Sequence, residues 1–463
     1  MATNIEKLII SHNKDAQNRK MVAFYDRKST MEKIGIARSE TAHSAFLANL
    51  LKSNNGLGLE ESAIMWLLHI LIEREDNATA YSTNATADST SPIPTDVKAA
   101  VLSQTLKYDI EEITTEKVID DVAPSFFATH YNNQKCDDRL DIYIKLKVNG
   151  LSVKYLEIVI ENKVLQDENG PKSKNSSGYN SLFQTQRYFT ACSSNKSSDT
   201  AQLFVFLTPD EVEEETKAKD KHFIQISYQD VLDTIIIPQL DNNMLTSNER
   251  QELENYVDAL NLPTLDIQAK KRIVMAMTEE ARIDRQTYLK KNKELIINVI
   301  KAKEKEAKKL SSLTEEEQIL VSFANKRKNL FAALGMDFDT IKTTYYFVFI
   351  TDGDTYRIAH LCTADVAVNF AKLYYKHNPG LTIEQLNNDF ANVKSNIFSV
   401  CNAQKNNTNS ALYVKIADYV YFPKNIWSGK KNEDGKENYF SKLLTMINKT
   451  NNVSKDSKYE VIK

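Results

Sequence analysis

Three charged residues, Glu157, Glu161 and Lys163, interrupt an apolar stretch of the sequence, "KYLEIVIENKV" at residues 154–164. Glu161 and Lys163 lie there two positions apart among Ile, Val and Leu, which are typical of a buried strand. Side chains two positions apart on a strand share a face, so the carboxylate and the ammonium group should lie side by side. Burying a charge is costly unless it is paired or binds a metal ion. The stretch is therefore a candidate for chemistry.

A second acidic residue, Asp141, lies in the preceding β-rich stretch, "RLDIYIKLKV". The dipeptide Asn149-Gly150 separates the two stretches and predicts a hairpin, which would bring Asp141 beside Glu161 and Lys163. Carboxylate oxygens suit a hard cation such as Mg²⁺, and an ammonium group can orient or activate a metal-bound water. Such a set is suited to metal-assisted hydrolysis of a phosphodiester bond. A plain salt bridge at the end of a strand is the alternative.

The elements that must position these residues alternate between helices and strands. Two helices joined by "NNGLG" are expected between Met31 and Glu73, and residues 75–96 are expected to form a surface loop because they lack periodicity. A short helix from Asp96 precedes three β-rich stretches. A helix, "SLFQTQRYFTAC", two further strands, "QLFVFLTP" and "FIQISY", and a helix ending near residue 240 follow. This order predicts an α/β domain around a mixed sheet, which together with N-terminal helices comprises residues 1–240.

These motifs together resemble the PD-(D/E)XK nuclease superfamily, whose fold is restriction-endonuclease-like. The resemblance extends from about residue 31 to residue 240. It rests on Asp141, on Glu161-Asn162-Lys163, on "QTQRY" within a helix, and on three further pieces. "ETAHSAFLANLL" is similar to the first helix of a bacterial branch, and "VFLTPD" and "ISYQDVL" are similar to its last strands. The resemblance implies a mixed sheet flanked by helices.

The resemblance also implies a metal centre. Asp141 and Glu161 would be ligands of Mg²⁺, with Mn²⁺ as a second possible ion, and the carbonyl group of Asn162 would be a backbone ligand. Lys163 would be the catalytic lysine. Leu140 occupies the position at which the family name has proline, a position that varies within the family.

Three more residues match the family outside this centre. Glu40 matches the acidic residue of the first helix, which assists the metal site, and the alternative is an ordinary acid on a helix surface. Gln184 and Tyr188 are four positions apart on one helix face and would border the active site and the substrate phosphate. The alternative for both is a polar residue at the edge of the core.

Three other ionisable residues are expected to be structural. Glu157 shares the strand face of Glu161 but lies further from the strand end, so a salt bridge is at least as reasonable as a role beside the active site. His43 and His130 belong to no metal-ligand pair and have no neighbouring nucleophile in the sequence.

The remaining sequence predicts two further parts. Residues 241–340 are expected to form a charged helical region, whose thin apolar stripe indicates a solvated helix face or an arm rather than a DNA-binding surface. Residues 341–463 are expected to form a separate α+β domain that recognises substrate or partner. Its stretch "YVYFPKNIWSGKKNEDGK" sets aromatic residues beside lysines, which suits base stacking, but packing in a core is the preferred interpretation.

Composition excludes several other classes of protein. The net charge of −3 argues against a basic nucleic-acid coat protein. The four cysteines lack a Cys-x-x-Cys pair, which argues against a zinc ribbon and a disulfide framework. No run reaches the roughly 18 apolar residues of a membrane helix, and a cytoplasmic location is expected. The motifs of a Gly-rich phosphate loop, a serine-hydrolase elbow and a zinc-protease helix do not occur.

The expected function is that of a Mg²⁺-dependent nuclease, with DNA preferred over RNA as the substrate. Bacterial defence or DNA processing is the expected role, and a homodimer or a protein partner bound through the C-terminal region is compatible with the sequence. The alternative is a catalytically inactive nuclease-fold protein that acts in binding or as a scaffold. The complete set of Asp141, Glu161 and Lys163 favours the enzyme, because a degenerate site should lose at least one of them.

Overall fold

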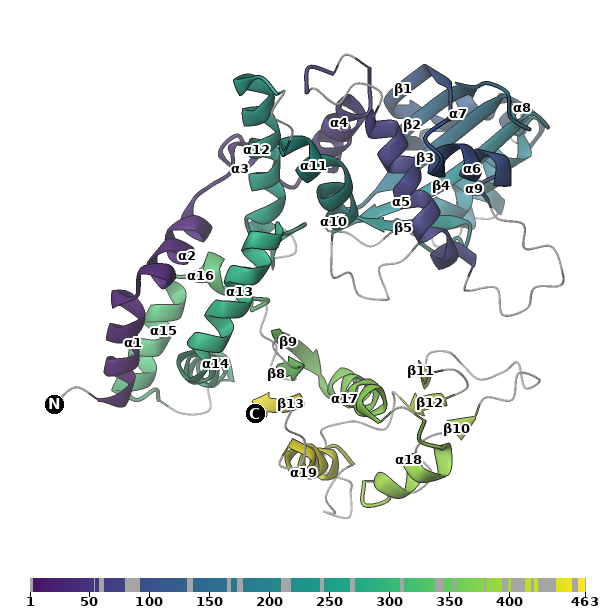
Figure 1. Cartoon of the computed structure of the whole chain (residues 1–463). Coiled ribbons are helices and arrows are strands. Elements are labelled where there is room, and N and C mark those ends of the chain that lie inside the picture. The colour runs from purple at the N-terminus through teal and green to yellow at the C-terminus, as the bar shows by residue number, and fades with distance from the viewer. Residues whose placement is uncertain are drawn as a thin grey trace. The chain divides into compact units, whose positions relative to one another are not determined.

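The computed structural model divides the chain into two compact units (Figure 1). One unit comprises residues 27–281, and the other combines residues 1–26 with residues 282–463. The structure describes residues 3–53, 55–57, 62–79, 92–130, 136–164, 168–172, 178–209, 218–241, 245–266, 271–308, 312–336, 338, 345–352, 355–378, 380–393, 399–400, 413–417, 420–423, 439–451 and 457–462. The first helices of the chain thus belong with its C-terminal part.

The unit of residues 27–281 is built around a five-stranded sheet in the order β1-β2-β3-β4-β5. The strands β1 (Tyr108–Val118), β2 (Arg139–Val148) and β3 (Tyr155–Asn162) are antiparallel. The strands β4 (Thr200–Thr208) and β5 (Phe223–Ser227) continue the sheet in parallel from β3. The β-branched residues that crowd these stretches favour strands. The predicted mixed sheet is confirmed.

Helices cover both faces of this sheet (Figure 1). The helices of the first face share one apolar core with the strands: α4 (Glu40–Leu50), α5 (Ser62–Thr79) and α6 (Thr95–Leu102). The helices of the opposite face pack on a second core: α7 (Ile119–Val122), α8 (Pro124–His130) and α9 (Gln184–Ser194). The sheet therefore lies between two layers of helices.

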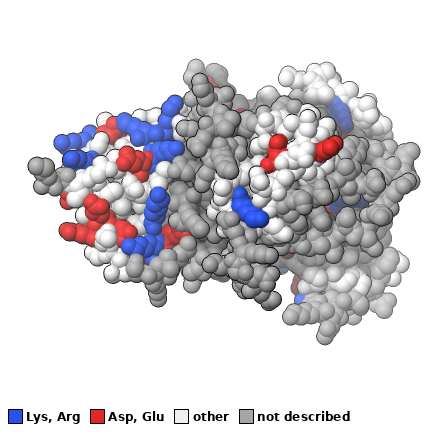
Figure 2. Space-filling view, turned by 90° about the horizontal axis from the view of Figure 1, so that it is seen from below, with Lys and Arg blue, Asp and Glu red and all other residues white. Residues whose placement is uncertain are grey.

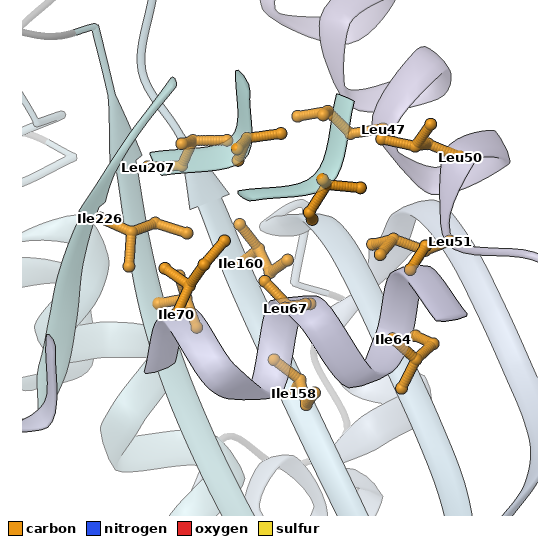
Figure 3. Close-up of a cluster of buried hydrophobic side chains, with 14 of the residues drawn as sticks. Leu47, Leu50, Leu51, Ile64, Leu67, Ile70, Ile158, Ile160, Leu207 and Ile226 are labelled. Atoms are coloured by element: carbon orange, nitrogen blue, oxygen red, sulfur yellow. The ribbon is translucent and has the colours of Figure 1, made fainter. Parts of the chain in front are cut away.

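Leucine and isoleucine side chains fill the core of the first face (Figure 3). Leu50 and Leu67 of the helices belong to the same core as Ile158 and Ile160 of β3, and all four are buried. A cavity of about 20 Å³ lies among these apolar side chains. It has room for no more than a water-sized molecule, and its apolar lining disfavours even that. This core is structural.

The ends of some elements differ from the prediction. α5 continues to Thr79, into the stretch expected to be a loop, of which residues 80–91 lie outside the described residues. β3 begins only at Tyr155, so the hairpin connection is longer than Asn149-Gly150, and the Val148 N–H closes it on the Lys154 carbonyl. The helix near residue 240 contains a π-helical turn between two short α-helices: α10 (Tyr228–Val231), the π turn Leu232–Ile236 and α11 (Ile237–Leu240).

The rest of this unit consists of short elements and one longer helix: α3 (Thr30–Lys33), α12 (Ser247–Asn261), β6 (Thr264–Asp266) and β7 (Lys271–Ile273). β6 and β7 pair as an antiparallel two-stranded sheet. The expectation of helix throughout this region is therefore wrong at these residues, where Pro263 follows the end of α12 and favours an extended chain. α13 (Glu279–Lys291) begins in this unit and continues into the other.

The second unit pairs the N-terminal helices with later ones: α1 (Asn4–Lys14), α2 (Ala16–Asp26), α14 (Lys293–Lys308), α15 (Glu315–Asn325) and α16 (Lys328–Ala333). Buried polar contacts join the two groups. His12 Nε2 lies 2.8 Å from the hydroxyl of Tyr288, and the side-chain amides of Asn18 and Asn292 bond each other at 3.1 and 3.0 Å. Such satisfied contacts fix one arrangement of the helices.

The C-terminal part of this unit contains two small sheets. The first has the order β13-β8-β9, and β8 and β9 form the predicted hairpin: β8 (Tyr345–Asp352), β9 (Thr355–Cys362) and β13 (Ser457–Ile462). The second comprises β10 (Ser399–Val400), β11 (Tyr413–Ala417) and β12 (Val420–Pro423). The accompanying helices are α17 (Thr363–His377), α18 (Ile383–Asp389) and α19 (Tyr439–Asn451). Most of the aromatic and lysine stretch beyond Pro423 lies outside the described residues.

The described surface carries charges of both signs. Figure 2 shows Lys and Arg interspersed with Asp and Glu over the described residues at the left of that view. A mixed distribution of this kind is typical of a solvated helix face rather than of a nucleic-acid-binding patch. Among the described helices, none combines the length and the apolar composition needed to cross a membrane.

Candidate active site

Asp141 and Glu161 lie across from each other on neighbouring strands. β2 and β3 pair Ile142 with Ile160, and the same antiparallel register, continued by one residue, brings Asp141 opposite Glu161. The backbone N–H of Asn162 donates a hydrogen bond to Asp141 Oδ2 at 2.7 Å. The hairpin thus brings together the two carboxylates that the sequence singled out.

Lys163 follows β3 and joins this pair. Its Nζ lies 2.6 Å from Glu161 Oε1 and 3.4 Å from Glu40 Oε2, and its side chain is almost wholly buried. Burial lowers the pKa of the Lys163 ammonium, but the carboxylates of Glu161, Glu40 and Asp141 together outweigh it, and the pKa lies above its ordinary value. Lys163 is therefore held as a cation.

The carboxylate of Glu161 is completely buried. Oε1 faces the Lys163 ammonium, whereas Oε2 has no hydrogen-bond donor among the described residues. Burial, and next to it the negative charge of Asp141, raise the pKa of Glu161 well above its ordinary range. An acceptor oxygen without a donor in the interior is costly and calls for an explanation.

Asp141 has the same excess of negative charge around it. Burial raises the pKa of Asp141 to about 6, the carboxylates of Glu40 and Glu116 add to this rise, and Lys163 and the Asn162 N–H oppose it. A divalent cation would favour the ionised form of each carboxylate. The donor set consists of carboxylate oxygens, which suit a hard cation, and the donor-free oxygen of Glu161 is consistent with such an ion. The residues present therefore fit a divalent metal ion.

Glu40 is the first residue of α4, whose N-cap is Ser39. The Ser39 hydroxyl accepts a hydrogen bond from the Ala42 N–H at 3.2 Å, which fixes the start of the helix. Glu40 Oε1 accepts a hydrogen bond from the Val164 N–H at 3.2 Å, and its Oε2 faces Lys163. The structure therefore brings Glu40 to the candidate site, as expected from the sequence.

Asn162 lies between Glu161 and Lys163 in the sequence. Its backbone N–H holds Asp141, and its side chain is buried on the opposite face of the sheet. A bond from its backbone carbonyl to a metal ion stays a prediction.

Gln184 and Tyr188 lie on the first turns of α9 and bond each other, with Gln184 Nε2 donating to the Tyr188 hydroxyl at 2.7 Å. That hydroxyl donates to the carbonyl of Arg139 at the start of β2, and Asn169 Nδ2 donates to Gln184 Oε1 at 3.0 Å. Burial and then the Glu161 carboxylate raise the pKa of Tyr188 well above its ordinary value. Both side chains thus tie α9 to the strand that carries Asp141, and a contact with substrate phosphate stays a prediction.

Glu116 is a neighbour of the site that the sequence did not reveal. It lies in β1, where Thr115 pairs with Ile142 and Lys117 pairs with Leu140, so the register places it opposite Asp141. Its φ is 54°, a left-handed backbone conformation that non-glycine residues rarely adopt. Backbone strain of this kind gathers at functional sites. The sequence offers no signal for it, because a glutamate within a β-rich stretch is expected to have an extended backbone.

Glu168 is a second residue that sequence reasoning missed. It is buried, and its Oε1 accepts hydrogen bonds from the N–H and the hydroxyl of Thr185, both at 2.6 Å, at the start of α9. Its Oε2 accepts a bond from the Lys219 N–H at 2.6 Å. A carboxylate so placed stabilises the N-terminus of a helix. Glu168 therefore holds α9 in place without contacting the carboxylates of the site.

Cys136, Asp137 and Asp138 form another group of potential metal ligands. Lys172 Nζ lies 2.5 Å from Asp137 and 3.2 Å from Asp138, and Arg187 Nε lies 2.9 Å from Asp138. Two cationic side chains thus occupy the positions at which a metal ion would compensate the charge. This group fits a metal ion less well than the set around Glu161.

The residues expected to be structural have protein partners where the structure describes them. Glu157 Oε2 accepts a hydrogen bond from Gln202 Nε2 at 2.9 Å. His43 is completely buried, with Nδ1 3.1 Å from the hydroxyl of Tyr256 and Nε2 3.2 Å from the carbonyl of Ala37. Burial lowers the pKa of His43 to about 4. The side chain of His130 lies outside the described residues.

Comparison with known proteins identifies a family that matches the part of the chain in which the candidate site lies. A family model described as the PD-(D/E)XK nuclease superfamily matches residues 30–258. Comparisons with curated proteins and with solved structures gave no match. The matched residues include the five-stranded sheet, α4, α9 and Lys163 directly after β3, and thus every side chain of the candidate site. Through residues 30–258, this chain belongs to the PD-(D/E)XK nuclease superfamily.

Proposed function

We propose that this chain is a metal-dependent nuclease that hydrolyses phosphodiester bonds, with DNA as the preferred substrate. The observation that carries the proposal is the fully buried carboxylate of Glu161, one oxygen of which faces Lys163 while the other has no donor among the described residues. Such an oxygen is suited to a cation. The family supports a nuclease, and bacterial defence or DNA processing is the role that we infer for it.

Each residue of the site has a separate part in this proposal. Asp141 and Glu161 would hold Mg²⁺ or Mn²⁺ through their carboxylates, and the Asn162 carbonyl would be a further ligand. When bound, the ion would stabilise developing negative charge and lower the pKa of a water molecule. Lys163, held beside Glu161 and Glu40, would orient or polarise the attacking water. Glu40 holds the Lys163 ammonium in place.

A cleavage assay on the full chain tests this proposal. Single- and double-stranded DNA and RNA are incubated with Mg²⁺ or Mn²⁺, and a chelator is expected to stop cleavage. Asp141→Asn should abolish cleavage because it removes a metal ligand. Lys163→Ala should slow cleavage by about 10²- to 10⁴-fold, as expected for a positioned catalytic side chain.

Glu157→Gln is the matched control, because Glu157 lies on the same strand and face as Glu161 but bonds Gln202 instead. It should cleave at nearly the wild-type rate. If the pure wild-type protein cleaves no substrate, or if Asp141→Asn and Lys163→Ala cleave as fast as wild type, the proposal is wrong and a catalytically inactive scaffold is favoured. Circular dichroism on each variant confirms that the comparison is made between folded proteins.

A further inference from the structure

Asn162 occupies a strand position at which an apolar side chain would be expected. The residues that precede it on the same face of β3, Ile158 and Ile160, are buried in the core, and Asn162 is also completely buried. Burying an amide is costly unless it forms hydrogen bonds. The partners of this amide therefore show what it contributes.

Three hydrogen bonds satisfy the Asn162 side chain. Its Nδ2 donates to the backbone carbonyl of Glu40 at 3.2 Å and to Ser44 Oγ at 3.0 Å. The hydroxyl of Tyr228 donates to its Oδ1 at 2.8 Å. Tyr228 is itself completely buried and is the first residue of α10, directly after β5. One amide thus joins the end of β3 to α4 and to α10.

The same short segment holds the groups of the candidate site. The Asn162 N–H donates to Asp141, and the Val164 N–H donates to the Glu40 carboxylate. The Asn162 side chain binds the backbone of Glu40 from the opposite face of the sheet. With the ion pair to Lys163, Glu40 is therefore fixed at three points to this segment, and a rotation of the Asn162 side chain would release one of them.

We infer that Tyr228 and the side chain of Asn162 are positioning residues, which hold Glu40 and Lys163 at set distances from Asp141 and Glu161. This inference rests on the proposed nuclease function. Neither side chain touches the reacting atoms, because both lie on the face of the sheet opposite to the carboxylates. A displacement of about 1 Å can slow a reaction by about 10²-fold, so a bond that prevents it affects rate without affecting substrate binding.

Tyr256 provides a matched comparison for Tyr228. Both tyrosines are completely or almost completely buried, and the hydroxyl of each bonds one side chain, that of His43 for Tyr256 and that of Asn162 for Tyr228. His43 lies on α4, one turn after Glu40. Tyr256→Phe and Tyr228→Phe therefore remove the same group from the same core, but only Tyr228→Phe removes a bond to the segment of the site.

The experiment measures cleavage kinetics and backbone amide exchange in the full chain. Tyr228→Phe should lower kcat by about ten- to a hundredfold with little change in KM, because positioning acts on the transition state. Tyr256→Phe should leave kcat within about twofold of wild type. In metal-free protein labelled with ¹⁵N-valine, the Val164 amide should exchange about tenfold faster in Tyr228→Phe, as expected from the loss of about one hydrogen bond's free energy. The Val159 amide, in the interior of β3, should not change.

A double variant tests whether the two residues act through one bond. Tyr228→Phe should have no further effect on kcat or on Val164 exchange when Asn162→Ala is already present, because coupled residues are not additive. Additive losses would overturn the inference, as would an equal loss of kcat in Tyr256→Phe or unchanged Val164 exchange in Tyr228→Phe. If wild type cleaves nothing, the proposed function fails and amide exchange alone decides: selective loss of protection at Val164 supports the positioning role, and its absence overturns it.

Discussion

Glu40, Asp141 and Glu161 surround a single ammonium group, that of Lys163, and this imbalance governs the chemistry of the site. Of the three carboxylates, Glu161 is completely buried. Without a metal ion, the protein reduces the repulsion by raising the pKa of Asp141 and of Glu161. The site is thus destabilised in its empty, ionised form, and metal binding and protein stability should be linked.

Asp141→Asn should raise the free energy of unfolding of the metal-free protein at pH 8. Burial raises the pKa of Asp141 from 3.8 to about 6, so ionisation in the folded state is unfavourable, and the wild-type protein loses stability as the pH rises through about 6. The variant lacks this loss and should be more stable by about 1–3 kcal/mol at pH 8, with the difference disappearing below pH 4.

Urea unfolding with a chelator present, at both pH values, measures this difference. Glu157→Gln, which removes from the strand of Glu161 a carboxylate that bonds Gln202, is the control. A variant Asp141→Asn that is less stable than wild type at pH 8 would contradict the charge imbalance.

Addition of Mg²⁺ or Mn²⁺ should raise the thermal midpoint of the wild-type protein and release protons. The ion favours ionised carboxylates, so protons leave Asp141 and Glu161, whose pKa values are raised in the metal-free state. The shift should be smaller at pH 5 than at pH 8. Differential scanning fluorimetry and an indicator dye in weak buffer measure the two effects, and Asp141→Asn should lose most of both. An equal response in that variant would place the ion elsewhere.

At the scale of elements, β1 stores strain next to the site. Glu116 has a left-handed backbone at the position opposite Asp141, whereas its strand neighbours do not. Glu116→Gly should therefore be more stable than Glu116→Ala by about 1 kcal/mol, since both remove the carboxylate but only glycine adopts this φ without cost. Urea unfolding of the two variants checks the difference.

Glu112, in the same strand, does not have a left-handed φ and is the control. Glu112→Gly should be less stable than Glu112→Ala by a similar amount, because glycine in a strand only adds conformational freedom to the unfolded chain. If glycine destabilises at both positions, the strain at Glu116 is absent in solution.

The sequence predicts those parts of the site that depend on local pattern. Spacing of two along a strand places Glu161 and Lys163 on one face, and a hairpin brings Asp141 to them, so the structure has the expected juxtaposition. The bond between Tyr228 and Asn162 joins residues far apart in the chain, and a buried tyrosine after a strand has no pattern that distinguishes it from an ordinary core residue. Long-range contacts of this kind follow from the packing of elements and are not encoded in local periodicity.

The same limit applies to the boundaries of elements and units. The mixed sheet follows from the order of β-rich and helical stretches, whereas the pair β6 and β7 is too short to show a period in the sequence. The grouping of the first 26 residues with residues 282–463 depends on contacts such as that of His12 with Tyr288. A division of the chain by composition alone does not detect them.

At the scale of the whole molecule, residues 27–281 should fold as an independent fragment. Its C-terminal end is tied to the core, since Gln229 and Met277 exchange two hydrogen bonds of 2.8 Å and Met275 is completely buried. The fragment 27–281 should unfold cooperatively and keep the cleavage activity of the full chain. The fragment 27–270, which lacks Met275 and Met277, should be less stable by about 3 kcal/mol or more.

Thermal unfolding by circular dichroism, together with the cleavage assay, compares the two fragments with the full chain. An aggregated fragment 27–281 would show that the unit depends on residues outside these bounds, and two fragments of equal stability would show that residues 271–281 do not stabilise it.

The discontinuous unit also has a consequence for synthesis on the ribosome. α1 and α2 emerge first, but their partners α14, α15 and α16 are translated only after the 27–281 unit. At about 5–20 residues per second, this interval lasts roughly ten seconds to a minute. Throughout it, side chains that end in the core, such as Ile5, Met21 and Tyr25, have no later partner to cover them. The nascent chain therefore presents an apolar N-terminal segment to chaperones while the 27–281 unit and the helices after it are still being translated.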